Sequence, residues 1–428
     1  MQAQFTKKQI TFLVAAGALV LVVILVFFRI IPGRRVTDIK TANLVVWGVD
    51  EPNAWENTID SFRKVFPGAK IEYRQFEEDS YEKDVINALA ENRGPDVFMF
   101  DNNWLLKHKN KIVPIPQDKM SISTLKSLFP QTVEKDFILG DRIYALPLYI
   151  DTLALVYNRD HFDQAGIAAS PITWAELDLF IPQLKRINEN NQLTRSPFAI
   201  GGSSESIENA PDLLDLFLLQ TGSTIIDEKL TQTLFYNEAG INALSKYTSY
   251  SNPNSDIYSW STKEKSDFDK FAKGDASAIF AYKKQLEKIR AKNSLLNWAV
   301  GSMPQVNDSS AVNYPNYYGL VVSNNALDLN VAWDFVVFAA TDKGSAEFYS
   351  RANNFPPALR FLIDVQKNDP GADGIYARQA LTARSWLQPD PVVITDFFDE
   401  AIRNVLDGSL DSQQSLEKLG LQIEDLLR

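Results

Sequence analysis

Carboxylate, amide and aromatic side chains follow several of the apolar runs that predict strands. Asp50 comes shortly after one such run, and Asp101, Asn102 and Trp104 come directly after another. Aromatic rings stack on the C–H faces of sugars, while carboxylates and amides hydrogen-bond sugar hydroxyl groups. In open α/β sheets, ligands lie beyond the carboxyl ends of the strands. The pattern therefore predicts a binding site for a polar solute, with a sugar as the first expectation.

Five further residues occupy comparable positions and join the predicted site. Trp47 ends the first apolar run, Tyr149 and Asp151 precede a later predicted strand, and Gly202 and Ser203 follow another apolar run. A glycine at such a place lets backbone amides approach a ligand, because it has no Cβ atom. Gly202 and Ser203 also fit a simple flexible turn, and Trp47 also fits the core of a strand.

Structural roles compete with binding at the first group of residues too. Asp50 fits the N-cap of the helix that follows it as well as it fits a ligand contact. The stretch from Asp101 to Trp104 fits an Asx turn beside a core tryptophan. Both interpretations stay open from the sequence alone.

Enzyme motifs are absent from the sequence. It has two histidines, His108 and His161, and neither belongs to an H-E-x-x-H motif. There is no G-x-S-x-G elbow, no Walker A motif and no G-x-G-x-x-G motif. His108 lies in a lysine-rich stretch and is expected at the surface. We therefore predict a protein that is not an enzyme and has no metal or cofactor, although counting carboxylates alone leaves a two-carboxylate glycosidase open.

Composition restricts the class of protein further. A chain of 428 residues is too long for one small core, so two lobes are expected. The absence of cysteine excludes disulfides, thiolate metal sites and a lipid-bearing cysteine. A net charge of −11 repels phosphate backbones, so nucleic acid is not an expected partner. The same charge favours a neutral or cationic solute.

The N-terminal segment predicts a membrane anchor. Residues Ile10 to Phe28 form a run of 19 residues that is apolar except for Thr11 and Gly17. This length is close to the roughly 20 residues that a membrane-spanning helix needs. Positive charges flank both ends, so the positive-inside rule gives no orientation. An uncleaved transmembrane signal anchor is favoured over a cleaved leader, and residues 1–42 are assigned to tail, anchor and linker.

The next part of the chain predicts a parallel sheet. Strand-like runs over residues 43–47, 70–75 and 96–100 alternate with helical spacing over 54–66 and 81–91. This β-α-β-α-β order implies right-handed crossovers and an α/β fold. Further on, residues 250–265 are polar and contain proline, so they are expected to form an exposed connection.

Five local patterns in this order resemble the extracytoplasmic solute-binding proteins of ABC importers, in the class that includes maltose-binding protein. The first two are Leu44–Asp50, like the first strand and ligand loop, and Gly94–Phe100, like the third strand. Tyr144–Asn158 is similar to the segment that crosses the hinge. Pro171–Leu177 and Phe271–Phe280 resemble two further conserved elements of that class.

The resemblance implies a two-lobed α/β fold of the periplasmic-binding-protein type II, here preceded by a transmembrane helix. Lobe I would comprise residues 43–150 and 322–355, and lobe II residues 151–321 and 356–428. The solute, a sugar by this resemblance, would bind between the lobes as the hinge closes. The resemblance also adds four aromatic residues to the predicted ligand site, namely Tyr282, Tyr317, Tyr318 and Trp386.

The resemblance further implies a monomer that delivers its solute to ABC permease subunits. The bulk of the chain would lie on the extracytoplasmic side of the cell membrane, held there by residues 10–28. The sequence departs from many relatives, because it lacks a lipid-bearing cysteine. A membrane-anchored sensor with the same fold therefore stays open as an alternative, as does a peptide, polyamine or other polar solute.

Overall fold

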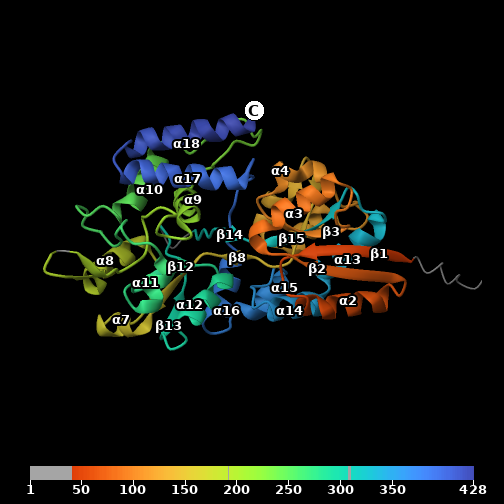
Figure 1. Cartoon of the computed structure of the whole chain (residues 1–428), viewed down its shortest axis with the longest axis horizontal. Helices are drawn as coiled ribbons and strands as arrows, with labels where there is room; N and C mark the ends of the chain where they lie inside the picture. Colours follow the sequence, from red (N-terminus) through yellow and green to blue (C-terminus); the bar gives the residue numbers. More distant parts are fainter. Residues whose placement is uncertain (1–40, 191, 307–309) are drawn as a thin grey trace, which may run out of the picture.

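Two separate hydrophobic cores divide the molecule into two lobes. The computed structural model describes residues 41–190, 192–306 and 310–428. One core contains residues from Ala42 to Ile150 and from Tyr317 to Ile363, and the other contains residues from Leu153 to Tyr314 and from Trp386 to Ile423. The lobes lie side by side along the long axis (Figure 1). A chain of this length exceeds what a single core usually supports, which explains the division.

The first lobe is built on a sheet of six strands. They are β1 (Ala42–Gly48), β2 (Ala69–Gln75), β3 (Val97–Asp101), β4 (Ile112–Val113), β7 (Leu146–Pro147) and β15 (Tyr318–Ser323). The order is β2-β1-β3-β15-β4, with β7 also paired to β15. Strand β1 is parallel to β2 and β3, whereas β15 runs antiparallel to β3. The predicted parallel β-α-β-α-β unit is confirmed.

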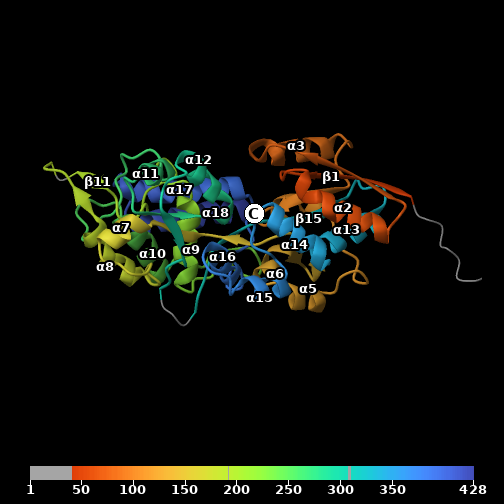
Figure 2. The same ribbon diagram turned by 90° about the horizontal axis from the view of Figure 1, so that it is seen from below.

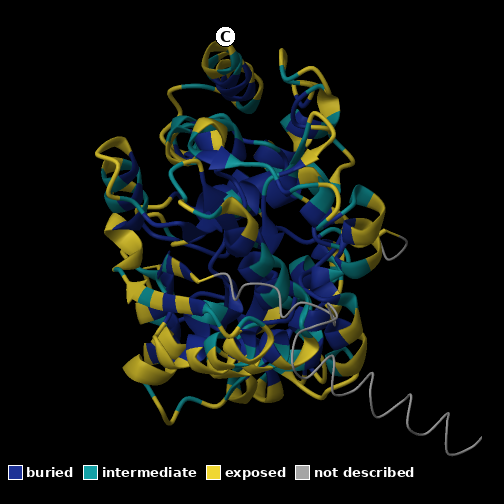
Figure 3. Ribbon diagram, turned by 90° about the vertical axis from the view of Figure 1, so that its right-hand side faces the viewer, coloured by how far each residue is buried: buried dark blue, intermediate teal, exposed yellow. Residues whose placement is uncertain are grey.

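Helices cover both faces of this sheet. Helices α2 (Asn53–Val65) and α3 (Glu78–Ala90) are the crossovers between the first three strands. Figure 2 shows α3 at one side of the lobe and α5 (Ile122–Leu128) and α6 (Gln131–Phe137) at the opposite side. Buried residues line the interior and exposed residues lie on the outer helices (Figure 3). The sheet of this lobe is therefore sandwiched between helices, as parallel strands require.

The second lobe has a smaller, antiparallel sheet. Strand β9 (Ala154–Asn158) lies between β12 (Ala278–Ala281) and β13 (Trp298–Gly301). The leucine-rich helix α9 (Ala210–Gln220) packs against α10 (Glu238–Ser249) and α17 (Pro391–Leu406). Helix α18 (Ser412–Leu427) forms the outermost layer of this lobe beside α17 (Figure 1).

The remaining elements connect these layers or cover them. In the first lobe they are α4 (Leu105–His108), η1 (Lys109–Lys111), β5 (Ile138–Leu139), β6 (Arg142–Ile143), α13 (Leu329–Thr341), α14 (Lys343–Ala352) and α15 (Arg360–Gln366). Beyond it lie α7 (Arg159–Gln164), α8 (Trp174–Leu184), β10 (Arg186–Ile187), β11 (Leu193–Arg195), α11 (Asp267–Lys273), η2 (Lys283–Gln285), α12 (Leu286–Lys292) and α16 (Ala372–Ala380).

Two short strands lie where the chain passes between the lobes. Strand β8 (Asp151–Thr152) pairs antiparallel with β14 (Pro315–Asn316). The predicted lobe I ended at residue 355, but Leu359 and Ile363 are buried in the first core. Helix α16 contributes Tyr376 to the second core and Ala377 to the first, so it lies against both lobes.

Residues 250–265 form a connection without helix or strand, and most of it is exposed or half-buried, as predicted, but a few of its residues are anchored in the second core. Tyr250 and Trp260 are fully buried in the second core. The hydroxyl of Ser259 donates to the carbonyl of Phe198 at 2.7 Å and accepts from its backbone N–H at 2.8 Å. The Trp260 indole N–H donates to Ser206 at 3.1 Å. Hydrogen bonds of Ser259 and Trp260 to another segment therefore anchor this connection to the second core, which its composition could not reveal.

The predicted transmembrane run Ile10–Phe28 lies outside the described residues. Among the helices of residues 41–428 that the structure describes, none has both the length and the apolar character needed to cross a bilayer.

Asp151 ties the strand between the lobes to helix η2. Its carboxylate accepts backbone N–H groups from Thr152 at 2.8 Å and from Lys283 and Lys284 at 2.9 Å each. The side chain has no exposed surface. Replacing it leaves buried donors without an acceptor, which costs about 1–3 kcal/mol for each group.

We therefore expect Asp151→Ala to lower the free energy of unfolding in urea by at least about 2 kcal/mol. The matched control is Asp163→Ala, because Asp163 is an exposed aspartate of the same lobe. An Asp151→Ala protein as stable as the control would contradict this role.

Candidate functional site

A cleft lies between the two lobes and is the candidate functional site. Its volume is about 500 Å³, and both lobes supply residues to its walls. The first lobe contributes Val49, Asp50, Glu78, Asp79, Tyr149, Tyr318, Asn353, Asn354 and Phe355; the second contributes Glu208, Lys283, Lys284, Gln285, Glu287 and Lys288. Carboxylates, amides, lysines and aromatic rings thus face one space.

Lys284 crosses this cleft from the second lobe. Its ammonium donates to Glu78 of the first lobe at 3.1 Å and to Asn316 of β14 at 2.9 Å. Only 23% of the side chain is exposed. Burial disfavours the charged form, but Glu78, Asp101 and Asp151 outweigh this effect and hold the pKa of Lys284 above its ordinary value. The lysine therefore stays charged in the cleft.

The charge of this ammonium acts on four aspartates. Burial raises the pKa of Asp50 to about 7 and the pKa values of Asp101, Asp151 and Asp212 to about 6. The positive charge of Lys284 opposes this rise at each of the four. One cation therefore offsets the charge of carboxylates that come from both lobes.

Aromatic rings form the apolar part of the walls. Tyr149 and Phe355 stack with ring centroids 4.1 Å apart and planes 26° apart. Tyr318 contacts Tyr81 and Trp104 edge-on, with centroids 6.4 and 6.1 Å away. Tyr149 is 1% exposed and Tyr318 is 5% exposed, so both are held rigidly. Fixed aromatic surfaces of this kind suit the C–H faces of sugar rings.

Three predicted site residues line the cleft, and three more lie beside it. Asp50, Tyr149 and Tyr318 face the cavity. Asp101 and Asp151 act on Lys284 electrostatically. Tyr282 donates its hydroxyl to Asp212 at 2.7 Å, and Asp212 in turn senses the charge of Lys284. The rule that selects strand ends therefore found part of this site.

Four other predicted residues pack in or next to the first core. The Trp47 ring lies on Phe76, with centroids 4.3 Å apart, and Trp104 is held between Phe100, Tyr81 and Tyr318. The Asn102 amide oxygen accepts the backbone N–H of Tyr317 at 3.1 Å, and the Tyr317 hydroxyl donates to Asp136 at 2.6 Å. None of these four lines the cleft, so a ligand contact for them stays a prediction.

The last three predicted residues lie in the second lobe. The carbonyl oxygen of Gly202 accepts the Tyr247 hydroxyl at 2.8 Å, and the Ser203 carbonyl accepts the backbone N–H of Ile207 at 2.9 Å. The Trp386 indole N–H donates to Asp215 at 2.7 Å. All three are buried and lie outside the walls of the cleft.

The lysines and glutamates of the cleft were not among the predicted site residues. Lys283, Lys284 and Gln285 follow directly after β12, at the same strand end that selected Tyr282. Glu78 opens the helix that follows β2. The strand-end rule could have found them, but lysines and glutamates in a soluble protein are mostly surface residues. Asn353, Asn354 and Phe355 follow a helix, and the sequence carried no signal for them.

His108 is buried rather than exposed, contrary to the prediction. It is 7% exposed and its ring nitrogen Nε2 lies 2.7 Å from Glu82. Lys107 also contacts Glu82, at 2.8 Å, and reaches Asp390 of the second lobe at 2.9 Å. One face of helix α4, with Leu105 and His108, is buried, although the stretch as a whole is rich in lysine. Within the described ranges, no group of three or more histidine or acidic side chains is placed to hold a metal ion.

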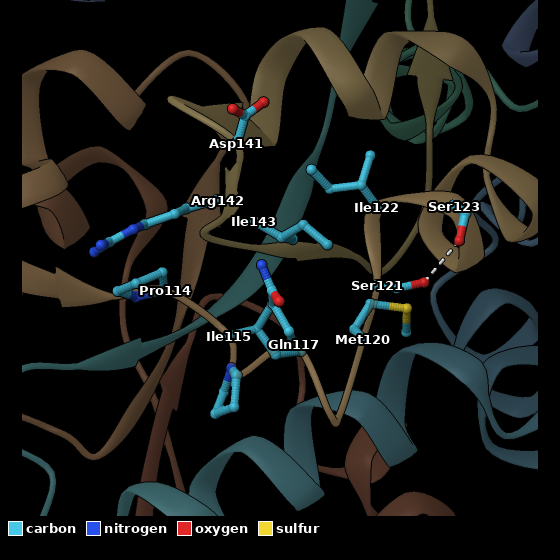
Figure 4. Close-up of a pocket in the computed structure, with 11 residues that line it drawn as sticks. Pro114, Ile115, Gln117, Met120, Ser121, Ile122, Ser123, Asp141, Arg142 and Ile143 are labelled. Atoms are coloured by element: carbon cyan, nitrogen blue, oxygen red, sulfur yellow. Dashed lines mark hydrogen bonds between the residues drawn. The ribbon is translucent and has the colours of Figure 1, made fainter.

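A second cavity of about 550 Å³ lies within the first lobe. Residues 114–123 and 141–143 form its walls, and Ile115, Met120, Ile122 and Ile143 supply its apolar surface (Figure 4). None of the predicted site residues lines it. The second lobe contributes nothing to this cavity, so closure of the lobes could not enclose a solute there.

A family model describing bacterial extracellular solute-binding proteins matches residues 48–346 of the chain. A putative binding protein of Brucella abortus is 23% identical over 137 residues, which cover 32% of this chain and 33% of the relative. The chain thus aligns with about a third of that relative's length. The galactooligosaccharide-binding protein of Bacillus subtilis is 22% identical over 413 residues, covering 89% of this chain and 88% of the relative.

Solved structures share the fold at low sequence identity. A cyclo/maltodextrin-binding protein complexed with maltotetraose has a TM-score of 0.75 and 16% identity, covering 91% of this chain and 98% of that one. The sugar-binding protein MalE of Xanthomonas citri has a TM-score of 0.75 and 17% identity, covering 90% and 97%. An ABC transporter solute-binding protein of Thermotoga lettingae bound with α-D-tagatose has a TM-score of 0.70 and 19% identity, covering 91% and 100%. The predicted two-lobed α/β fold is confirmed.

Burial of aspartates predicts how stability depends on pH. Seven of the aspartates that the structure describes have raised pKa values: about 7 for Asp50, Asp136, Asp215 and Asp267, and about 6 for Asp101, Asp151 and Asp212. The folded state therefore holds protons that the unfolded chain releases near its ordinary value of 3.8. Their contribution to stability is largest at low pH and is lost as pH rises through the folded values.

We expect the melting temperature without solute to rise as pH falls from about 7.5 to about 5.5, because the native state takes up protons across this range. His161 opposes this trend, since burial lowers its pKa to about 4, but it is one group against seven. Asp50→Asn should flatten the dependence, because its amide can still accept from Tyr349 without titrating. A melting temperature that falls steadily towards pH 5.5 would contradict the assignment.

Proposed function

The chain belongs to the family of bacterial extracellular solute-binding proteins, and we propose that it captures a carbohydrate between its two lobes for an ABC importer. The observation that carries this proposal is the cleft itself, because it combines rigid aromatic surfaces with fixed hydrogen-bonding groups from both lobes. Membership of a family of binding proteins agrees with the prediction that the chain is not an enzyme. Sugars named for several structures of the same fold support a carbohydrate as the solute.

Each wall of the cleft has a proposed role in binding. Tyr149, Phe355 and Tyr318 stack on the apolar faces of the sugar, as fixed rings can do without losing much conformational entropy. Asp50 and Gln285 hydrogen-bond its hydroxyl groups from opposite lobes. The other predicted residues that pack behind these side chains hold them in position.

Closure of the two lobes completes the site. The strands β8 and β14 form a narrow connection, and a hinge at such a connection absorbs the change in backbone angles. Lys284 and Lys107 each bridge from one lobe to a carboxylate of the other, at Glu78 and Asp390. Because these contacts join the two lobes, the lobes already face each other in the structure. Binding energy from both walls becomes available only in this state.

The proposed setting is the extracytoplasmic side of the membrane, in keeping with a family of extracellular proteins. The predicted anchor at residues 10–28 would keep the receptor close to its permease and so raise its local concentration there. Delivery to permease subunits and a monomeric state are part of this proposal. A membrane-anchored sensor would use the same cleft, and it would respond to solute without supporting uptake.

A thermal-shift panel tests the proposal on the full chain. Neutral mono- and oligosaccharides, a polyamine and a short peptide are each added in excess. A solute present at 100 times its dissociation constant stabilises the folded state by about 2.7 kcal/mol. We expect a sugar to raise the melting temperature. If only the polyamine or the peptide does so, the carbohydrate assignment is wrong.

Phe355→Ala should weaken binding of that sugar about 3- to 10-fold, because aromatic contacts of this kind contribute about 0.5–1.5 kcal/mol. Isothermal titration calorimetry measures the change. The matched control is Phe361→Ala, since Phe361 is 52% exposed and lies outside the walls of the cleft. Equal affinities of the two variants would remove Phe355 from the site.

A further inference from the structure

Every lysine in the walls of the cleft is already paired with a carboxylate. Lys283 contacts Asp373 at 2.7 Å, Lys284 contacts Glu78 at 3.1 Å, and Lys288 contacts Glu208 at 2.5 Å. An acidic solute entering the cleft would have to compete with these carboxylates for each ammonium group. The pairing thus leaves the cleft poorly equipped to compensate a negative charge.

The aspartates on which Lys284 acts differ from the lysines, because most of them accept hydrogen bonds from neutral groups instead of pairing with an opposite charge. Asp50 accepts the Tyr349 hydroxyl, Asp101 accepts the backbone N–H of Asn103 at 2.9 Å, and Asp212 accepts the Tyr282 hydroxyl at 2.7 Å. Lys284 is the cation that acts on all three, and also on Asp151. Without the charge of Lys284, only hydrogen bonds from neutral groups would oppose the mutual repulsion of these four carboxylates.

We propose that Lys284 determines which solute charge the cleft accepts, by occupying the position against Glu78 that the ammonium group of an amino sugar would otherwise take. With Lys284 present, the cleft takes neutral carbohydrates and rejects acidic ones. With Lys284 removed, it prefers a carbohydrate that carries an amino group. This inference rests on the proposed function, because it concerns the same cleft.

The geometry favours this role over that of a simple clasp between the lobes. Lys284 comes from a short helix whose backbone N–H groups are fixed by Asp151, so its side chain starts from a rigid base. Its ammonium also reaches Asn316, a neutral residue of the connecting strand β14. A clasp would affect solutes of every charge equally, whereas a residue that sets charge preference changes the ratio between them.

Calorimetric titrations at about pH 6 with three trisaccharides test the inference. The probes are maltotriose, which is neutral, the trimer of glucosamine, which is cationic, and the trimer of galacturonic acid, which is anionic. The wild type should bind the anionic probe most weakly. Lys284→Met should shift the ratio of the two dissociation constants at least about 10-fold in favour of the cationic probe over maltotriose.

Three further variants keep the result interpretable. Lys292→Met removes a lysine of the same lobe that is also paired with a carboxylate, Asp269, but lies outside the walls of the cleft, so the ratio should change less than about 2-fold. Lys284→Arg keeps the charge and should retain the wild-type order of the probes. Glu78→Gln added to Lys284→Met should reduce the gain for the glucosamine trimer, because the partner of the ammonium is then neutral.

The outcomes separate this inference from the proposed function. If no neutral sugar binds the wild type but Lys284→Met binds the glucosamine trimer, the carbohydrate proposal for the native protein fails and the charge role of Lys284 is supported. An unchanged ratio in a folded Lys284→Met protein overturns the inference, as does the absence of binding of the cationic probe to that variant. Tight binding of the galacturonate trimer by the wild type overturns it as well. Melting curves establish that each variant is folded.

Discussion

A charged ammonium group held among carboxylates from both lobes is the constraint on which the geometry of the cleft depends. A buried charge needs a partner, since leaving one uncompensated costs far more than a hydrogen bond contributes. Lys284 meets this need through Glu78 of the opposite lobe and through the aspartates around it. When the lobes face each other these residues lie opposed, and the space that remains beside them is the cleft.

The fold positions this lysine through its backbone. Asp151 belongs to the connection between the lobes and accepts the N–H groups of Lys283 and Lys284, so the hinge and the short helix η2 form one unit. The aromatic walls are fixed in a similar way, because Tyr149 stacks on Phe355 and Tyr318 packs on Trp104. A movement at the hinge thus changes the distance between the charged wall of the second lobe and the aromatic wall of the first. Opening of the lobes therefore takes the two halves of the site apart.

The sequence predicted the fold well because periodicity and strand order are local signals. It predicted part of the site, since Asp50 and Tyr149 came from the strand pattern, Tyr318 came from the family resemblance, and all three face the cleft. Other predicted residues found partners that no local pattern reveals: Trp386 donates to Asp215, and Tyr317 donates to Asp136, each far away in the chain. Lys284 and Glu78 also follow strands, but lysines and glutamates are mostly surface residues, and their pairing depends on how two separate lobes meet.

The central claim is that solute binds where the two lobes meet. A crystal structure of the complex with the sugar that most raises the melting temperature tests it directly. We expect electron density for the sugar between Tyr149 and Phe355 of the first lobe and Lys284 and Gln285 of the second. Density for the sugar in the cavity formed by residues 114–143, or on an outer surface with the cleft unoccupied, would contradict the account.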